Sequence, residues 1–104
     1  MKNLSLTDPL SYIDNLSLME KAKVVLTDSG GIQEETTVLS VPCLTLRKNT
    51  ERPITITEGT NRLVGVETNN ILQGFHDIAK ISPQSPPLWD GNTACRIVKT
   101  LEEL

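Results

Sequence analysis

Aromatic residues and histidine are scarce in this chain of 104 residues, which has one Tyr, one Phe, one Trp and one His. The chain has ten Lys and Arg residues and 13 Asp and Glu residues, which gives a formal net charge of −3. No basic cluster stands out in the sequence. A polyanionic nucleic acid is therefore not expected as a partner. The single histidine, His76, lies near Phe75 in a helix-like stretch, so we expect a surface or packing role for it and no metal site.

Cysteine is also rare, with only Cys43 and Cys95, and no Cys-x-x-Cys pair occurs. We interpret both as free buried thiols. A disulfide or a metal site is the alternative that the spacing leaves open.

Long apolar runs are missing as well, and none approaches the roughly 20 residues needed to span a bilayer. The first residues lack the apolar stretch of a signal peptide, so we expect a cytoplasmic protein without membrane contact. Apolar residues make up 38% and charged residues 22% of the chain, as in a globular protein. The length allows one small domain.

Short β-branched runs alternate with amphipathic stretches along most of the chain. The first helix is predicted to open at Asp8-Pro9, because Asp can cap a helix and Pro suits its first position. The pattern then predicts strand 24–26, helix 32–40, strand 43–46, an ambiguous segment 54–58, strand 61–66, helix 69–81, loop 82–87 and a last helix after 90–92.

Several helices carry apolar stripes that should face a core. The predicted inward positions are Ile13, Leu16, Met19 and Ala22; Ile32, Thr36 and Leu39; Ile71, Leu72, Phe75, Ile78 and Ala79; and Ala94, Ile97, Val98, Leu101 and Leu104. The alternation predicts an α/β fold, Rossmann-like, with three layers (α/β/α) around a short parallel sheet. Because the pattern starts in mid-course, we expect the chain to be part of a larger domain.

The most informative segment runs from Thr27 to Glu35 and reads as a strand, a glycine turn and a helix start. Unpaired N–H groups at a helix start favour an anion, and glycines let a phosphate approach closely. Ser29, Gly30 and Gly31 are thus candidate phosphate ligands, and Glu35 could accept hydrogen bonds from a ribose diol. The segment is neither a G-x-G-x-x-G fingerprint nor a Walker motif, so a tight strand-to-helix connection without a ligand remains the alternative.

A second polar cluster, Arg47 to Pro53, follows the next strand and should lie at the same edge of the sheet. The guanidinium of Arg52 could complement a diphosphate, and Glu51 could orient it. A solvated charged loop is the alternative.

These segments resemble the UDP-N-acetylglucosamine 2-epimerase family. The resemblance rests, in order and at family spacing, on Leu26 to Glu35, Val41-Pro42, Arg47, Asn49 to Pro53, Glu58 to Gly65 and Asp90 to Ala94. The Thr50-Glu51-Arg52-Pro53 form is similar to the non-hydrolysing branch.

The resemblance implies that residues 1–104 form part of the second, UDP-binding domain of a two-domain fold of the GT-B type. Residues 88–104 would then be a terminal helix that packs back towards the first domain. The family interconverts UDP-N-acetylglucosamine and UDP-N-acetylmannosamine by eliminating UDP and adding it back, without a cofactor or metal. The resemblance also implies a role in cell-surface polysaccharide biosynthesis and assembly into a homo-oligomer.

Carried over by resemblance, Ser29, Gly30 and Gly31 would hold the diphosphate, Glu35 the ribose, and Arg52 the phosphates or the sugar. The backbone near Leu10 would read the uracil. Asn15 stands where the family often has an aromatic residue, and Ser40 stands where it has Gly. The catalytic carboxylates belong to the first domain, so no catalytic residue is assigned here and the chain alone is expected to be inactive.

Two other functions remain open at this point. A glycosyltransferase of the same architecture would also place a glycine turn and a Glu over a nucleotide sugar, although the Asn49 to Pro53 segment argues against it. A stand-alone module for UDP-sugar binding or assembly is the second, because 104 residues cannot form a two-domain site.

Overall fold

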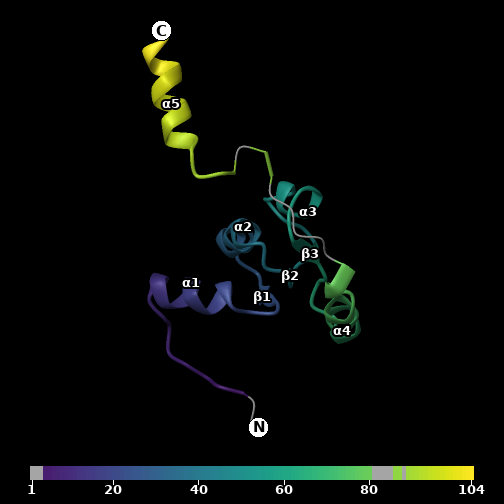
Figure 1. Cartoon of the computed structure of the whole chain (residues 1–104). Helices are drawn as coiled ribbons and strands as arrows, with labels where there is room; N and C mark the ends of the chain where they lie inside the picture. Colours follow the sequence, from purple (N-terminus) through teal and green to yellow (C-terminus); the bar gives the residue numbers. More distant parts are fainter. Residues whose placement is uncertain (1–3, 81–85, 88) are drawn as a thin grey trace.

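The computed structural model describes residues 4–80, 86, 87 and 89–104, and a parallel sheet lies at its centre (Figure 1). The strands are β1 (Val25–Thr27), β2 (Cys43–Thr45) and β3 (Asn61–Leu63), in the order β1-β2-β3. The helices are α1 (Tyr12–Glu20), α2 (Gly30–Leu39), α3 (Ile54–Thr57), α4 (Thr68–His76), the short 3₁₀ helix η1 (Ile78–Lys80) and α5 (Thr93–Glu102). The predicted α/β order and parallel sheet are confirmed, and the ambiguous segment is helical.

Side chains of β2 show that helices cover both faces of the sheet. The Cys43 thiol interacts with Thr36 of α2, whereas Leu44 lies beside Gly74 of α4. Since successive side chains of a strand point to opposite faces, α2 and α4 lie on opposite sides. The predicted three-layer arrangement is therefore present.

The first helix begins later than predicted. It starts at Tyr12, and the hydroxyl of Ser11 accepts a hydrogen bond from the Asp14 N–H at 3.2 Å. A serine is as good a cap as an aspartate, and this one precedes the helix, which leaves Asp8 and Pro9 outside it. Of the predicted stripe, Met19 is buried but Ile13 is exposed.

Helix α2 ends at a residue in the left-handed conformation. Ser40 has φ 59° and ψ 35°, and its N–H and that of Val41 bond to carbonyls of the last turn. Glycine adopts this conformation at little cost, whereas a serine pays for its Cβ. Ser40 therefore occupies a position whose backbone conformation favours glycine.

The core contains more polar side chains than the apolar stripes predict. The buried apolar residues are Met19, Val41, Cys43, Leu44 and Ile78; the buried polar ones are Gln33, Thr36, Thr37, Thr45, Thr55, Thr60 and Asn61. Thr36 and Ile78 were predicted to face inward. Ile32 and Leu39 are only half-buried, and Leu72 and Phe75 are exposed, contrary to the prediction.

Close packing of α4 explains the two exposed side chains. A Cβ on Gly74 would lie 2.6 Å from Cγ1 of Val64, so α4 approaches the sheet through its glycine. Leu72 and Phe75 consequently point away from the contact. The Lys23 ammonium lies over the Phe75 ring, 5.7 Å from its centroid.

A buried hydrogen-bond network joins the elements around Asn61. Its amide nitrogen donates to Gln33 Oε1 and Thr55 Oγ1, both at 3.0 Å, and its oxygen accepts from Thr45 Oγ1 at 2.5 Å. Gln33 Oε1 also accepts from Thr50 Oγ1 at 2.5 Å. One amide therefore ties α2, α3, β2 and β3 together.

The last helix, α5, stands away from the sheet (Figure 1). Its predicted stripe is exposed, including Ile97, Val98 and Leu101. Asn92 precedes the helix without a side-chain capping bond; instead, the Asp90 carboxylate accepts from the Asn92 N–H at 3.0 Å and from Arg96. The hydrogen bond from Arg96 holds the pKa of Asp90 below its usual range.

The two thiols differ. Cys43 is buried as predicted, and burial raises the pKa of its thiol despite hydrogen bonds to Thr36 and Thr45. Cys95 lies on α5 and is exposed, so the prediction of two buried thiols was wrong for it. Both cysteines are free thiols.

Within the described ranges, no helix has the length and apolar character to cross a membrane.

The network around Asn61 gives a first prediction. Asn61→Ala removes the partner of three buried polar groups, so the free energy of unfolding should fall by about 2–3 kcal/mol. Urea unfolding of the chain, followed by circular dichroism, measures this. Asn69→Ala, at an exposed position of α4, is the matched control and should change the free energy by less than about 0.5 kcal/mol. Equal effects of the two variants would contradict the structural role of the network.

Candidate functional site

Three loops meet at one edge of the sheet because the strands are parallel and end in register. Thr27 pairs with Thr45, and Thr45 with Leu63, at the last position of each strand. Beyond them the Leu46 N–H donates to the Thr27 carbonyl at 2.8 Å, and the Val64 N–H donates to that of Thr45 at 2.9 Å. The glycine turn and the arginine loop thus lie side by side, as predicted.

The glycine turn is the first turn of α2, which begins at Gly30 and not at Ile32 as predicted. Ser29 is the capping residue: its Oγ accepts from the Ile32 N–H at 3.4 Å, and its N–H donates to Thr27 Oγ1 at 3.1 Å. The N–H groups of Gly30 and Gly31 have no acceptor within the helix, as in any first turn. Such unpaired N–H groups are the feature on which the sequence-based prediction of an anion site depends, and anion binding here stays a prediction.

Packing does not explain why residues 30 and 31 are glycines. A Cβ on Gly30 would have its nearest neighbour, the Arg52 Cζ, at 3.7 Å, and one on Gly31 would have Ser29 Oγ at 3.8 Å. Neither has the positive φ seen at Gly65 and Gly91. Glycine disfavours a helix relative to alanine by roughly 1 kcal/mol. Neither the room for a Cβ nor the backbone conformation therefore requires glycine at residues 30 and 31.

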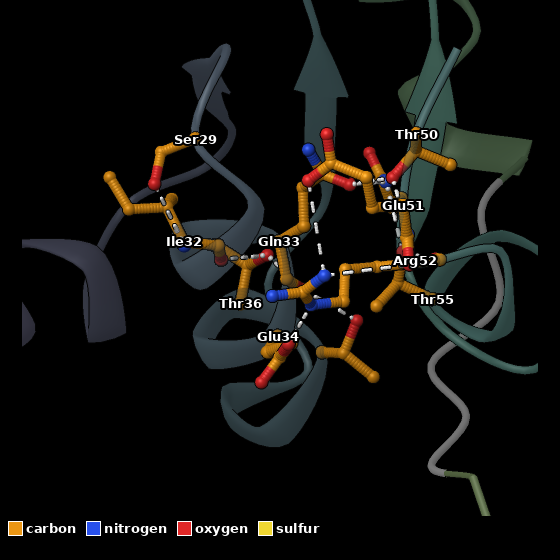
Figure 2. Close-up of polar contacts among 11 residues, drawn as sticks. Ser29, Ile32, Gln33, Glu34, Thr36, Thr50, Glu51, Arg52 and Thr55 are labelled. Carbon is orange, nitrogen blue, oxygen red and sulfur yellow. Dashed lines mark hydrogen bonds and ion pairs between the residues drawn. The ribbon is translucent and has the colours of Figure 1, made fainter.

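Arg52 brings a positive charge close to Gly30, and Figure 2 shows its guanidinium beside Glu34 of α2. Its Cζ and Nη2 lie 3.7 and 3.8 Å from the position that a Gly30 Cβ would take. Its Nε donates to Glu34 Oε1, whereas its Nη1 is 4.0 Å from Glu51 Oε2. Glu34, which the sequence analysis did not single out, is therefore the closer partner of Arg52; Glu51 is at the limit of ion-pair distance, and its predicted orienting role stays a prediction.

Glu35 follows Glu34 in α2 and has no such partner. It is half-buried, and within the part of the chain that the structure describes its carboxylate makes no hydrogen bond or ion pair. A half-buried carboxylate without partners suits an acceptor for ligand hydroxyls. Its predicted role in ribose binding remains a prediction.

Leu10 and Asn15 lie in a different part of the structure. Leu10 is exposed just before α1, and Asn15 is half-buried within it. Helix α1, which carries Asn15, packs on α2. Among the described residues, the Asn15 side chain makes no hydrogen bond to Ser29, Gly30 or Gly31.

Sequence reasoning overlooked three side chains at this site: Gln33, Glu34 and Thr50. Gln33 and Thr50 are polar residues used inside the structure, and no periodicity marks them. For Thr50 the sequence did offer one local signal: a threonine hydroxyl often accepts a hydrogen bond from the N–H group two residues later in the chain. Thr50 Oγ1 does so here, accepting from the Arg52 N–H at 2.9 Å. As for metals, the described ranges contain no cluster of three His, Cys, Asp or Glu residues suited to one.

Comparison with known proteins gives the family. Residues 1–102 match the family model for UDP-N-acetylglucosamine 2-epimerase. A UDP-N-acetylglucosamine 2-epimerase of Methanococcus maripaludis is 41% identical over 96 residues, which are 91% of this chain and 26% of that protein. One from Escherichia coli K12 is 39% identical, covering 98% of this chain and 29% of that protein.

Solved structures agree with these relatives. The UDP-GlcNAc 2-epimerase of Neisseria meningitidis, bound to UDP-GlcNAc, superposes with a TM-score of 0.86 at 39% identity, over 98% of this chain and 30% of that one. The Methanocaldococcus jannaschii enzyme in complex with UDP-GlcNAc and UDP gives 0.80 at 38% identity, over 94% and 27%. This chain spans less than a third of the length of these relatives, and it belongs to the UDP-N-acetylglucosamine 2-epimerase family.

Proposed function

We propose that residues 1–104 are the UDP-holding, carboxy-terminal part of an enzyme that interconverts UDP-N-acetylglucosamine and UDP-N-acetylmannosamine by eliminating and re-adding UDP. The family match and the relatives crystallised with UDP-GlcNAc support this proposal. They favour it over the glycosyltransferase alternative, since the relatives named above are epimerases.

The observation that carries the proposal is an open helix start that faces a cation. The N–H groups of Gly30 and Gly31 lie in the first turn of α2 and have no acceptor within the helix, and the Arg52 guanidinium carbon lies 3.7 Å from the position of a Gly30 Cβ. Both groups suit a dianionic or trianionic diphosphate: the helix start through its dipole and donors, the guanidinium through its charge.

In this proposal Ser29, Gly30 and Gly31 bind the diphosphate, and Arg52 lies against its phosphates or the sugar. Fixed donors at this place would stabilise the charge that develops on UDP as its bond to the sugar breaks. The same donors would hold UDP in position for its return. The enzyme thus needs them in both halves of the reaction.

The remaining roles in the proposal concern the nucleoside. Glu35, half-buried and without a partner, accepts hydrogen bonds from the ribose hydroxyls. The backbone near Leu10 reads the uracil, with Asn15 in place of a stacking aromatic residue.

The acid and base carboxylates of the reaction would come from another domain, and residues 88–104 would pack towards it. The exposed apolar stripe of α5 supports this docking, since contiguous exposed apolar side chains usually mark an interface. A homo-oligomer and a cytoplasmic location belong to the same proposal.

The glycine turn gives a sharp prediction. Gly31→Ala should leave the free energy of unfolding unchanged or raise it by up to about 1 kcal/mol, because the space for a Cβ is present and alanine favours the helix. UDP affinity of the full-length protein should nevertheless fall by about 1–3 kcal/mol, since the methyl group occupies the phosphate's space. Calorimetric titration with UDP and thermal melting measure the two quantities.

A matched control comes from Gly59, where a Cβ would lie 2.4 Å from the Thr55 carbonyl oxygen. Gly59→Ala should therefore lower stability, in contrast to Gly31→Ala. Unchanged UDP affinity in Gly31→Ala would show that the turn is only a connection between strand and helix.

The ribose contact gives another prediction. Glu35→Gln should keep the melting temperature and weaken UDP binding by about 1.5–3 kcal/mol, the scale of a hydrogen bond to a charged group. Calorimetry of the full-length protein measures this, with Glu20→Gln, an exposed carboxylate at the end of α1, as the control. Lost stability with unchanged affinity would instead make Glu35 a structural carboxylate.

Activity itself can be tested on two lengths of the protein. With UDP-N-acetylglucosamine as substrate, the 104-residue chain should form neither the mannosamine epimer nor the free glycal. A full-length protein that carries this chain should form the epimer, detected by chromatography and proton NMR. Turnover by the chain alone would contradict the placement of the catalytic carboxylates in another domain, and an inactive, folded full-length protein would contradict the proposed reaction.

A further inference from the structure

The guanidinium of Arg52 lies between two carboxylates, and they hold it very differently (Figure 2). Glu34 Oε1 accepts a hydrogen bond from Arg52 Nε. Glu51 Oε2 is 4.0 Å from Nη1, and the Glu51 carbonyl accepts a weak bond from Nη1 at 3.5 Å. The side chains of Arg52 and Glu34 are 40% and 42% exposed, so a second molecule can still reach the arginine.

The hold on Nε leaves most of the arginine's donors available. A guanidinium has five N–H groups, and the one on Nε is the one used by Glu34. The other four are on Nη1 and Nη2, and Nη2 is next to Gly30, 3.8 Å from where its Cβ would be. Glu34 thus fixes the guanidinium beside the helix start without using the Nη1 and Nη2 groups.

The backbone of Arg52 is fixed from the same helix. Its N–H donates to Thr50 Oγ1 at 2.9 Å, and Thr50 Oγ1 donates to Gln33 Oε1 at 2.5 Å. Its carbonyl accepts from Thr55 Oγ1 at 2.7 Å. Two consecutive residues of α2, Gln33 and Glu34, therefore position the backbone and the side chain of one arginine.

Charge alone would argue against a glutamate at this place. A carboxylate this close to a diphosphate site repels the ligand and offsets part of the arginine's attraction. An exposed ion pair also contributes little to stability. The remaining benefit is that the ion pair restricts the Arg52 side chain, which then loses less rotamer entropy when a ligand binds.

We propose that Glu34 is a positioning residue that holds Arg52 over the first turn of α2, ready for the diphosphate of UDP. This inference rests on the proposed function, because it needs a diphosphate at that turn. The direction of the change in UDP affinity tests it. If Glu34 positions Arg52, removing the Glu34 charge should weaken UDP binding; if Glu34 acts only by repelling the anion, removing its charge should strengthen UDP binding.

The experiment is a double-mutant cycle in the full-length protein, with UDP affinity measured by calorimetry. Glu34→Ala should weaken UDP binding roughly tenfold or more, the scale of an oriented hydrogen bond to a charged group. In the Arg52→Ala background the same change should have less than about a twofold effect, because the residue through which Glu34 acts is gone. Glu34→Gln keeps an oxygen acceptor for Nε and should retain more affinity than Glu34→Ala.

Two further measurements separate positioning from general effects. Glu51→Ala removes the same charge at the longer distance and should change UDP affinity less than about twofold, or raise it slightly. Melting temperatures show whether each variant is folded, and the near-isosteric Glu34→Gln serves as the test variant if Glu34→Ala is not. For Glu34→Gln alone, the inference requires weaker UDP binding than in the unaltered protein.

The outcomes distinguish the inference from the function on which it rests. Unchanged or tighter UDP binding in both Glu34 variants overturns the inference, as does an equal loss with and without Arg52. If Arg52→Ala binds UDP normally, then the role proposed for Arg52 fails and the inference fails with it. The proposed phosphate turn is judged separately by Gly31→Ala.

Discussion

The hydrogen-bond acceptor of Gln33 is the constraint on which the sheet edge depends. Its Oε1 receives the Asn61 amide from β3 and the Thr50 hydroxyl from the arginine loop, and Gln33 itself is 1% exposed. Because a buried polar group must be paired, each partner fixes the other. The helix that begins at the glycine turn, the strand behind it and the loop beside it are therefore held as one unit.

This unit explains how so short a chain holds the residues of the candidate site in one arrangement. The strands have only three residues each, and few apolar side chains are fully buried. Apolar burial is non-directional, whereas hydrogen bonds specify angles and distances. A polar core can therefore set the place of Arg52 relative to Gly30 more narrowly than the apolar contacts do. No buried side-chain polar atom among the described residues is left without a partner.

The same polar core shows the limits of reading helices by their apolar stripes. The prediction for α2 found Thr36 but not Gln33 or Thr37, which are also buried. The prediction for α4 failed at Leu72 and Phe75, because Gly74 makes the closest approach to the sheet and turns them outward. Hydrophobic periodicity assumes that the inward face is apolar, and here hydrogen bonds and a glycine contact decide the packing.

The sequence by itself determined the order of helices and strands, the parallel sheet, and the meeting of the glycine turn with the arginine loop. These follow from short-range signals, since turn residues and β-branched runs act within a few residues, and parallel strands must end at one edge. Only the tertiary structure decided which carboxylate holds Arg52 and where α2 begins relative to its glycines. Glu51 is next to Arg52 in the sequence, whereas Glu34 lies 18 residues away, so sequence proximity points to Glu51; the closer contact of Glu34 exists only once α2 and the loop pack together.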